Sequence, residues 1–72
     1  MKDVFVSYHY TGFDILGAQH QGFGSYIIHI QTPITQERLS DITERIRASV
    51  ADRLENLALK DITIAILYWQ VL

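Results

Sequence analysis

Three histidines are the side chains in this sequence that could bind a metal ion or move a proton. His9, His20 and His29 include no pair spaced two or four residues apart, the spacing that brings two imidazoles to one ion on a strand or a helix. The chain also contains no cysteine, which leaves no thiolate zinc site and no disulfide. We therefore predict no metal centre and interpret the histidines as residues of strand surfaces.

A nucleophile and a base occur together once, in the first apolar segment. Alternation along a strand places Ser7 and His9 on one face, but no third group is placed to orient the imidazole, as nucleophilic catalysis requires. The glycines of Gly22–Ser25 precede a strand, whereas phosphate-binding loops lead from a strand into a helix. We interpret them as a turn or bulge, and predict neither enzymatic activity nor a cofactor.

Three arginines, Arg38, Arg45 and Arg53, line one flank of a predicted helix and could bind an anion. A solvated helix face is the simpler interpretation. The alternative is binding of a nucleic acid or nucleotide, with strand aromatic residues as stacking groups. These groups would be Tyr8, Tyr10 and His9. The net charge of −2, from six basic and eight acidic residues, argues against a nucleic-acid partner.

The elements that must position these residues follow from hydrophobic periodicity. Alternating apolar residues predict strands over Asp3–Tyr10, over Ser25–Gln31 and from Asp61 onwards. An apolar stripe predicts a helix over Gln36–Glu55, with Thr35 as its N-cap. A chain of 72 residues is the size of one domain, so we predict a single α+β domain, residues 1–72, with the element order β-β-α-β.

The helical crossover constrains the order of the strands. A right-handed connection sets strands two and three in the same direction. We prefer an arrangement in which strand one lies between them to the sequential order 1-2-3. The sheet is then three-stranded and antiparallel in the order 2-1-3, with one helix on one face. Pro33 follows an edge strand in this order, where its missing N–H is tolerated. Asn56 is the residue expected to end the helix in a left-handed conformation.

The face of the sheet that the helix leaves uncovered is predicted to be apolar. The third strand has apolar residues on both faces, which is typical of a strand buried on both sides. A small chain without disulfides often gains stability by oligomerisation, so we predict a two-fold symmetric homodimer through this face. The expected interface residues are Phe5, Leu67, Trp69 and Val71.

The connection between the first two strands is unusual for a hairpin loop. Residues 11–24 hold all four glycines and four large apolar side chains: Phe13, Ile15, Leu16 and Phe23. Two interpretations stay open. The segment can be a longer hairpin whose apolar residues fill the core or cover the free face of the sheet. Alternatively, those four residues form an exposed tip that binds a protein partner.

Several short segments resemble small phage- and prophage-encoded proteins of unknown function. They are "VFVSY", "GFGSYII", "PIT" before the helix, and a final apolar strand. The resemblance implies an accessory role, such as binding and inhibiting a host or defence protein, and transfers no catalytic residues. With neither a signal peptide nor a membrane span expected, the hypothesis is a cytoplasmic, non-enzymatic protein-interaction module that acts as a homodimer.

Overall fold

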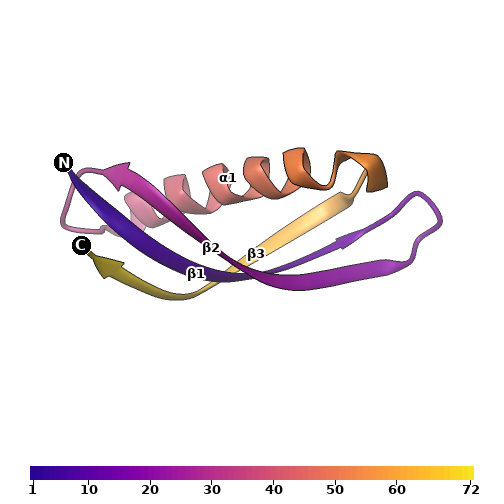
Figure 1. Cartoon of the computed structure of the whole chain (residues 1–72), viewed down its shortest axis with the longest axis horizontal. Coiled ribbons are helices and arrows are strands. Elements are labelled where there is room, and N and C mark those ends of the chain that lie inside the picture. The colour runs from indigo at the N-terminus through magenta and orange to yellow at the C-terminus, as the bar shows by residue number, and fades with distance from the viewer.

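The computed structural model describes residues 1–72 and contains three strands, one α-helix and a short 3-10 helix (Figure 1). Strand β1 spans Lys2–Phe13, β2 spans Gln19–Ile30 and β3 spans Lys60–Val71. Helix α1 spans Gln36–Arg53 and is followed by η1, Glu55–Leu57. This is the predicted β-β-α-β order.

β1 is the central strand of one antiparallel sheet with the strand order β2-β1-β3. The predicted α+β fold and the 2-1-3 order are therefore confirmed. α1 lies along one face of the sheet and leaves the opposite face, here called the open face, without a covering element (Figure 1). Pro33 follows the edge strand β2 and lies outside its ladder, as the missing N–H of proline favours.

The β1–β2 hairpin is longer than the sequence pattern indicated. Its strands pair in one unbroken register, from Lys2 opposite Ile30 to Phe13 opposite Gln19. Most of residues 11–24 are therefore strand. The interpretation of this segment as an extension of the two strands is confirmed, and only a short turn remains between them.

Two tyrosine–glycine pairs across the hairpin explain why the sequence pattern did not indicate the longer strands. Tyr10 pairs with Gly22, and Tyr8 pairs with Gly24. A Cβ atom on Gly22 would lie 2.8 Å from the Tyr10 ring, and one on Gly24 would lie 2.6 Å from the Tyr8 hydroxyl oxygen. The tyrosine rings occupy the space of the missing side chains. The prediction that Gly22–Ser25 forms a turn or bulge is wrong, because these glycines continue the strand without showing its alternation.

Helix α1 begins at the predicted cap. The Thr35 hydroxyl accepts a hydrogen bond from the backbone N–H of Arg38 at 3.3 Å, as expected of an N-cap residue. The helix ends at Arg53, two residues before the predicted end, and the chain continues into η1. Left-handed backbone occurs at Ala58, with φ 49°, and not at the predicted Asn56.

The core lies between α1 and the sheet. Its buried members are apolar or aromatic, and no polar or charged residue is buried with them: Val4, Val6, Tyr8, Ile28, Ile30, Ile42, Ile46, Val50 and Ile64. The helix contributes Ile42, Ile46 and Val50, the centre of the predicted stripe. Each such side chain contributes about 1.5–3 kcal/mol when fully buried. The core therefore stabilises the fold, and the Tyr8 hydroxyl within it accepts a hydrogen bond from Arg53.

An extra residue in β3 changes which face the end of that strand presents. Ser7 pairs with Tyr68 and its neighbour Tyr8 pairs with Ile66, so that Leu67 has no partner across the ladder. Such a bulge residue interrupts the alternation of side chains between the two faces. Residues after Leu67 therefore lie on the face opposite to the one that simple alternation assigns them.

Candidate functional site

The β1–β2 hairpin ends in a turn that carries two exposed apolar residues. Ile15 and Leu16 have 79% and 90% of their surface exposed, and Phe13, the last residue of β1, has 40% exposed. The turn lies at one end of the elongated molecule, beyond the end of α1 (Figure 1). Ile15 and Leu16 therefore neither fill the core nor fold back over the open face, and that part of the first interpretation is wrong. We call Phe13, Ile15 and Leu16 the apolar tip.

Backbone geometry determines what each turn position requires. Asp14 donates its N–H to the carbonyl of Ala18, and Gly17 donates its N–H to the carbonyl of Asp14, both at 3.0 Å. Gly17 has φ 81°, which matches a three-residue hairpin loop with a left-handed residue in its third position. Glycine is thus required at position 17. Ile15 and Leu16 meet no comparable requirement, so their apolar side chains are not explained by the turn.

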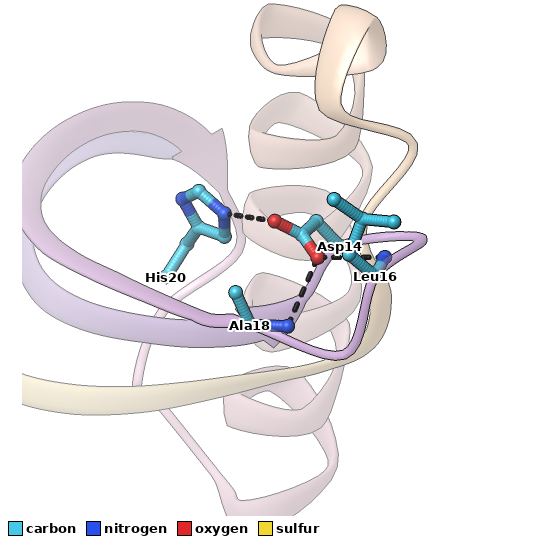
Figure 2. A network of polar contacts seen from close by, with 4 residues as sticks. All are labelled: Asp14, Leu16, Ala18 and His20. Carbon is cyan, nitrogen blue, oxygen red and sulfur yellow. Dashed lines mark hydrogen bonds and ion pairs between the residues drawn. The ribbon is translucent and has the colours of Figure 1, made fainter.

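The carboxylate of Asp14 holds this turn together (Figure 2). Its Oδ1 accepts hydrogen bonds from the N–H groups of Leu16 and Ala18, each at 2.9 Å. Its Oδ2 lies 2.8 Å from Nε2 of His20, which donates because an ionised carboxylate can only accept. The hydrogen bond from His20, followed by that from Ala18, lowers the pKa of Asp14 below its ordinary value of 3.8. The apolar tip is therefore presented by a turn that several hydrogen bonds define.

Phe23, the fourth residue of the predicted partner-binding set, lies apart from the apolar tip. It pairs with His9 near the middle of the hairpin, and their ring centroids are 4.8 Å apart with an interplanar angle of 50°. Both lie on the open face, because His9 alternates with the buried Tyr8. The structure therefore brings the other three predicted residues together and separates Phe23 from them.

The four predicted dimer residues do not share one face. Trp69 pairs with Val6 and Val71 pairs with Val4, both of which are fully buried in the core on the helix side. Directly paired residues lie on the same face of a sheet. Trp69 and Val71 are therefore on the helix side, and their assignment with Phe5 to the open face is wrong. The error arises because that prediction assumed unbroken alternation, whereas Leu67 is a bulge residue.

The helix arginines do not form a single anion site. Arg38 donates from Nη1 to the carbonyl of Pro33 at 2.6 Å, and Arg53 donates from Nη2 to the hydroxyl of Tyr8. These two guanidiniums belong to opposite ends of α1, about 22 Å apart along the axis, with Arg45 between them. Tyr8, predicted as a stacking group, is only 1% exposed and cannot stack on a base. The anion-binding alternative loses its main groups to contacts within the chain.

Arg47 is an arginine that the sequence pattern did not single out. Its Nε donates to the backbone carbonyl of Ile62 in β3 at 3.0 Å, and its Nη1 contacts the carboxylate of Glu44. The spacing of Glu44 and Arg47 indicates an ion pair on one helix face. The hydrogen bond from Arg47 to Ile62 joins residues that are distant in the sequence, so no local sequence pattern predicts it. Arg47 therefore ties the helix to the beginning of the edge strand.

The histidines and the molecular surface offer no further site. His20 contacts Asp14, Nδ1 of His29 lies 2.8 Å from Oδ1 of Asp3, and His9 lies beside Phe23. No three potential metal ligands converge, and the surface contains no pocket. The surface features left to consider are the apolar tip, the open face and the edges of the sheet.

Comparison of the chain with protein-family models, with curated proteins and with solved structures gives no match. No helix in the structure combines the length and the apolar character needed to cross a lipid bilayer. Function is therefore inferred from the surfaces described above.

Proposed function

We propose that the protein is a non-enzymatic interaction module that binds a protein partner through its apolar tip. One observation carries the proposal: Ile15 and Leu16 are almost completely exposed at the end of a hairpin whose turn does not require them to be apolar. Exposed apolar residues scattered singly are ordinary on protein surfaces. Ile15 and Leu16, in contrast, are adjacent to each other at the end of the hairpin, and Phe13, the last residue of β1, adds a third partly exposed apolar side chain nearby.

Binding energy supports a role as an anchor. Burying side chains of the size of Ile15 and Leu16 contributes about 1.5–3 kcal/mol each when they pass fully from water into an apolar pocket. The hydrogen bonds around Asp14 define the turn before binding, which lowers the cost of ordering it in a complex. The complementary site is an apolar pocket or groove on the partner, since large buried side chains tend to dominate interfaces.

The resemblance to phage-encoded proteins suggests the kind of partner. The proposal extends to a host or defence protein in the bacterial cytoplasm, whose activity the module modulates by occupying an apolar pocket. No catalytic step and no cofactor enters this role.

A paired comparison of two variants tests the role of the tip. We expect Ile15→Ser/Leu16→Ser to melt within a few degrees of the unchanged protein, because surface substitutions outside the core change stability by about 0.5 kcal/mol or less. In affinity capture from a bacterial lysate, analysed by mass spectrometry, this variant should lose the partner. The matched control is Ile27→Ser, which removes an exposed apolar side chain from the open face and should retain it.

Two outcomes would contradict the proposal. One is a tip variant that captures the same proteins in the same amounts as the unchanged chain. The other is an equal loss of binding in Ile27→Ser, which would assign the partner to the open face.

A further inference from the structure

β3 is an edge strand of the sheet. Its final residues, from Leu67 onwards, are exposed on both faces and carry no charge. Every residue from Leu67 to Leu72 is exposed. The large apolar or aromatic side chains among them are Leu67, Tyr68, Trp69, Val71 and Leu72. No charged residue and no proline follows Asp61. Natural edge strands are usually protected by lysine, by proline, by a bulge or by a covering segment. This part of β3 has the bulge at Leu67 at its start, but beyond it no charge, no proline and no covering segment.

The backbone groups on the outer side of this segment can be identified. Leu72 donates its N–H to the carbonyl of Asp3 in β1 at 2.9 Å. The groups of successive residues in an antiparallel strand point alternately to one side and the other. Those of Gln70 therefore also face β1, whereas those of Trp69 and Val71 face outward. No strand lies on that side, because the sheet order is β2-β1-β3.

The beginning of the same edge is covered. The carbonyl of Ile62 accepts a hydrogen bond from Nε of Arg47, so an arginine from α1 occupies that part of the edge. No hydrogen bond of this kind reaches the other end of the strand. The part of the edge farthest from this contact is Leu67–Val71, here called the free edge.

We propose that the free edge pairs antiparallel with the same edge of a second copy of this chain, forming a two-fold symmetric dimer with one continuous sheet. Antiparallel pairing of two identical strands is self-complementary, since the symmetry places each donor opposite an acceptor. It covers Tyr68 on the open face and Trp69 on the helix side together. Stacking of two open faces would leave Trp69 exposed.

One register uses the outward groups of both Trp69 and Val71. When Trp69 of one copy lies opposite Val71 of the other, both residues form reciprocal N–H to carbonyl pairs. Gln70 then lies opposite Gln70 of the second copy, and the two amide side chains can hydrogen bond across the symmetry axis. A second copy also meets no like charge along this strand, because the free edge is uncharged.

Mass and hydrogen exchange test the dimer directly. Sedimentation equilibrium at micromolar concentration should give twice the 8.3 kDa mass of the chain. The amides of Trp69 and Val71 should exchange slowly when the protein is concentrated and faster on dilution, whereas the amide of Gln70, bonded to β1, should stay slow in both. A monomer at all concentrations, or exchange without this alternation, would overturn the proposal.

Two variants locate the interface. Val71→Pro removes an outward N–H, and Gln70→Lys places like charges opposite each other across the axis. Each should weaken dimerisation by about tenfold or more. Gln70 is exposed and outside the core, so Gln70→Lys decides the matter if Val71→Pro does not fold.

The matched control is Ile27→Lys, which adds the same charge to an exposed position on the open face and should leave the dimer intact. A monomeric Ile27→Lys together with a dimeric Gln70→Lys would assign the interface to the open face and overturn the proposal. The tip variant Ile15→Ser/Leu16→Ser should remain dimeric, so that failure of the proposed tip function and failure of the dimer are separate results.

Discussion

Asp14 connects the protonation of one side chain to the shape of the apolar tip. Its pKa is lowered in the folded protein, mainly by the hydrogen bond with His20 and then by that with the Ala18 N–H. The stabilisation that a lowered pKa reports is present above the ordinary pKa of 3.8 and is lost as the pH falls through the folded value. We expect the amide resonances of Leu16 and Ala18 to move with a midpoint below 3.8 in an NMR titration.

The matched variant for this titration is Asp14→Asn, which keeps a side-chain oxygen as acceptor but has no carboxyl group to titrate. The two amide resonances should then show no transition in the acid range. A midpoint at or above 3.8 in the unchanged protein would contradict the hydrogen-bonded turn.

Gly24 shows how a missing side chain can determine packing. We predict that Gly24→Ala destabilises the protein by about 1–3 kcal/mol, because its Cβ would approach the buried Tyr8 hydroxyl at 2.6 Å. Tyr8 has little freedom to move, since Arg53 donates a hydrogen bond to the same hydroxyl. Urea unfolding measures the loss, and the neighbouring Ser25→Ala, exposed on the open face, should change stability by less than about 0.5 kcal/mol. Equal stability of the two variants would show that Tyr8 adapts.

At the scale of the element, α1 depends on a narrow row of buried side chains. We predict that Ile46→Ala lowers the free energy of unfolding by about 2–5 kcal/mol, because Ile46 is fully buried in the centre of the helix stripe. Chemical denaturation gives the difference. Arg45→Ala, on an exposed neighbouring position of the same helix, should change it by less than about 0.5 kcal/mol. A loss below about 1 kcal/mol for Ile46→Ala would be incompatible with the described packing.

Elements with strong local signals could be predicted from the sequence. The apolar stripe of α1 and the cap at Thr35 follow from spacing and side-chain chemistry, and both occur where they were expected. The sequence also favours the order 2-1-3 over 1-2-3, because 2-1-3 places strand one at the centre of the sheet and Pro33 beside an edge strand.

Features that depend on contacts across the sheet could not be predicted. Gly22 and Gly24 interrupt the apolar alternation of β2, so the sequence pattern does not indicate a strand there. The side chains that fill their positions are the Tyr10 and Tyr8 rings of β1. The bulge at Leu67 is visible only once β3 is aligned with β1. A pattern of apolar residues therefore indicated that the end of β3 is unusual, but not which face each side chain occupies. In residues 11–24 the same pattern favoured a core role and left an exposed tip as the alternative.

The whole molecule separates its two proposed interaction surfaces. The chain is elongated, with extents of 41 × 18 × 17 Å. The hairpin turn lies at one end, and the end of β3 lies at the other (Figure 1). A second copy on the free edge would therefore leave the apolar tip accessible on each chain. A dimer of this shape presents two tips, which can raise the strength of binding to a partner with repeated sites.

The central position of β1 also has a consequence for the speed of folding. Phe13 lies six positions from its β2 partner Gln19 but 47 positions from its β3 partner Lys60. Hairpins between near neighbours in sequence form within about 1–10 μs, whereas pairing between distant segments must first close a long loop at an entropic cost. The hairpin can therefore assemble early, and until β3 returns, β1 has its donors and acceptors uncovered along one side. We therefore expect the return of β3, and not the formation of the hairpin, to limit how fast this fold is completed.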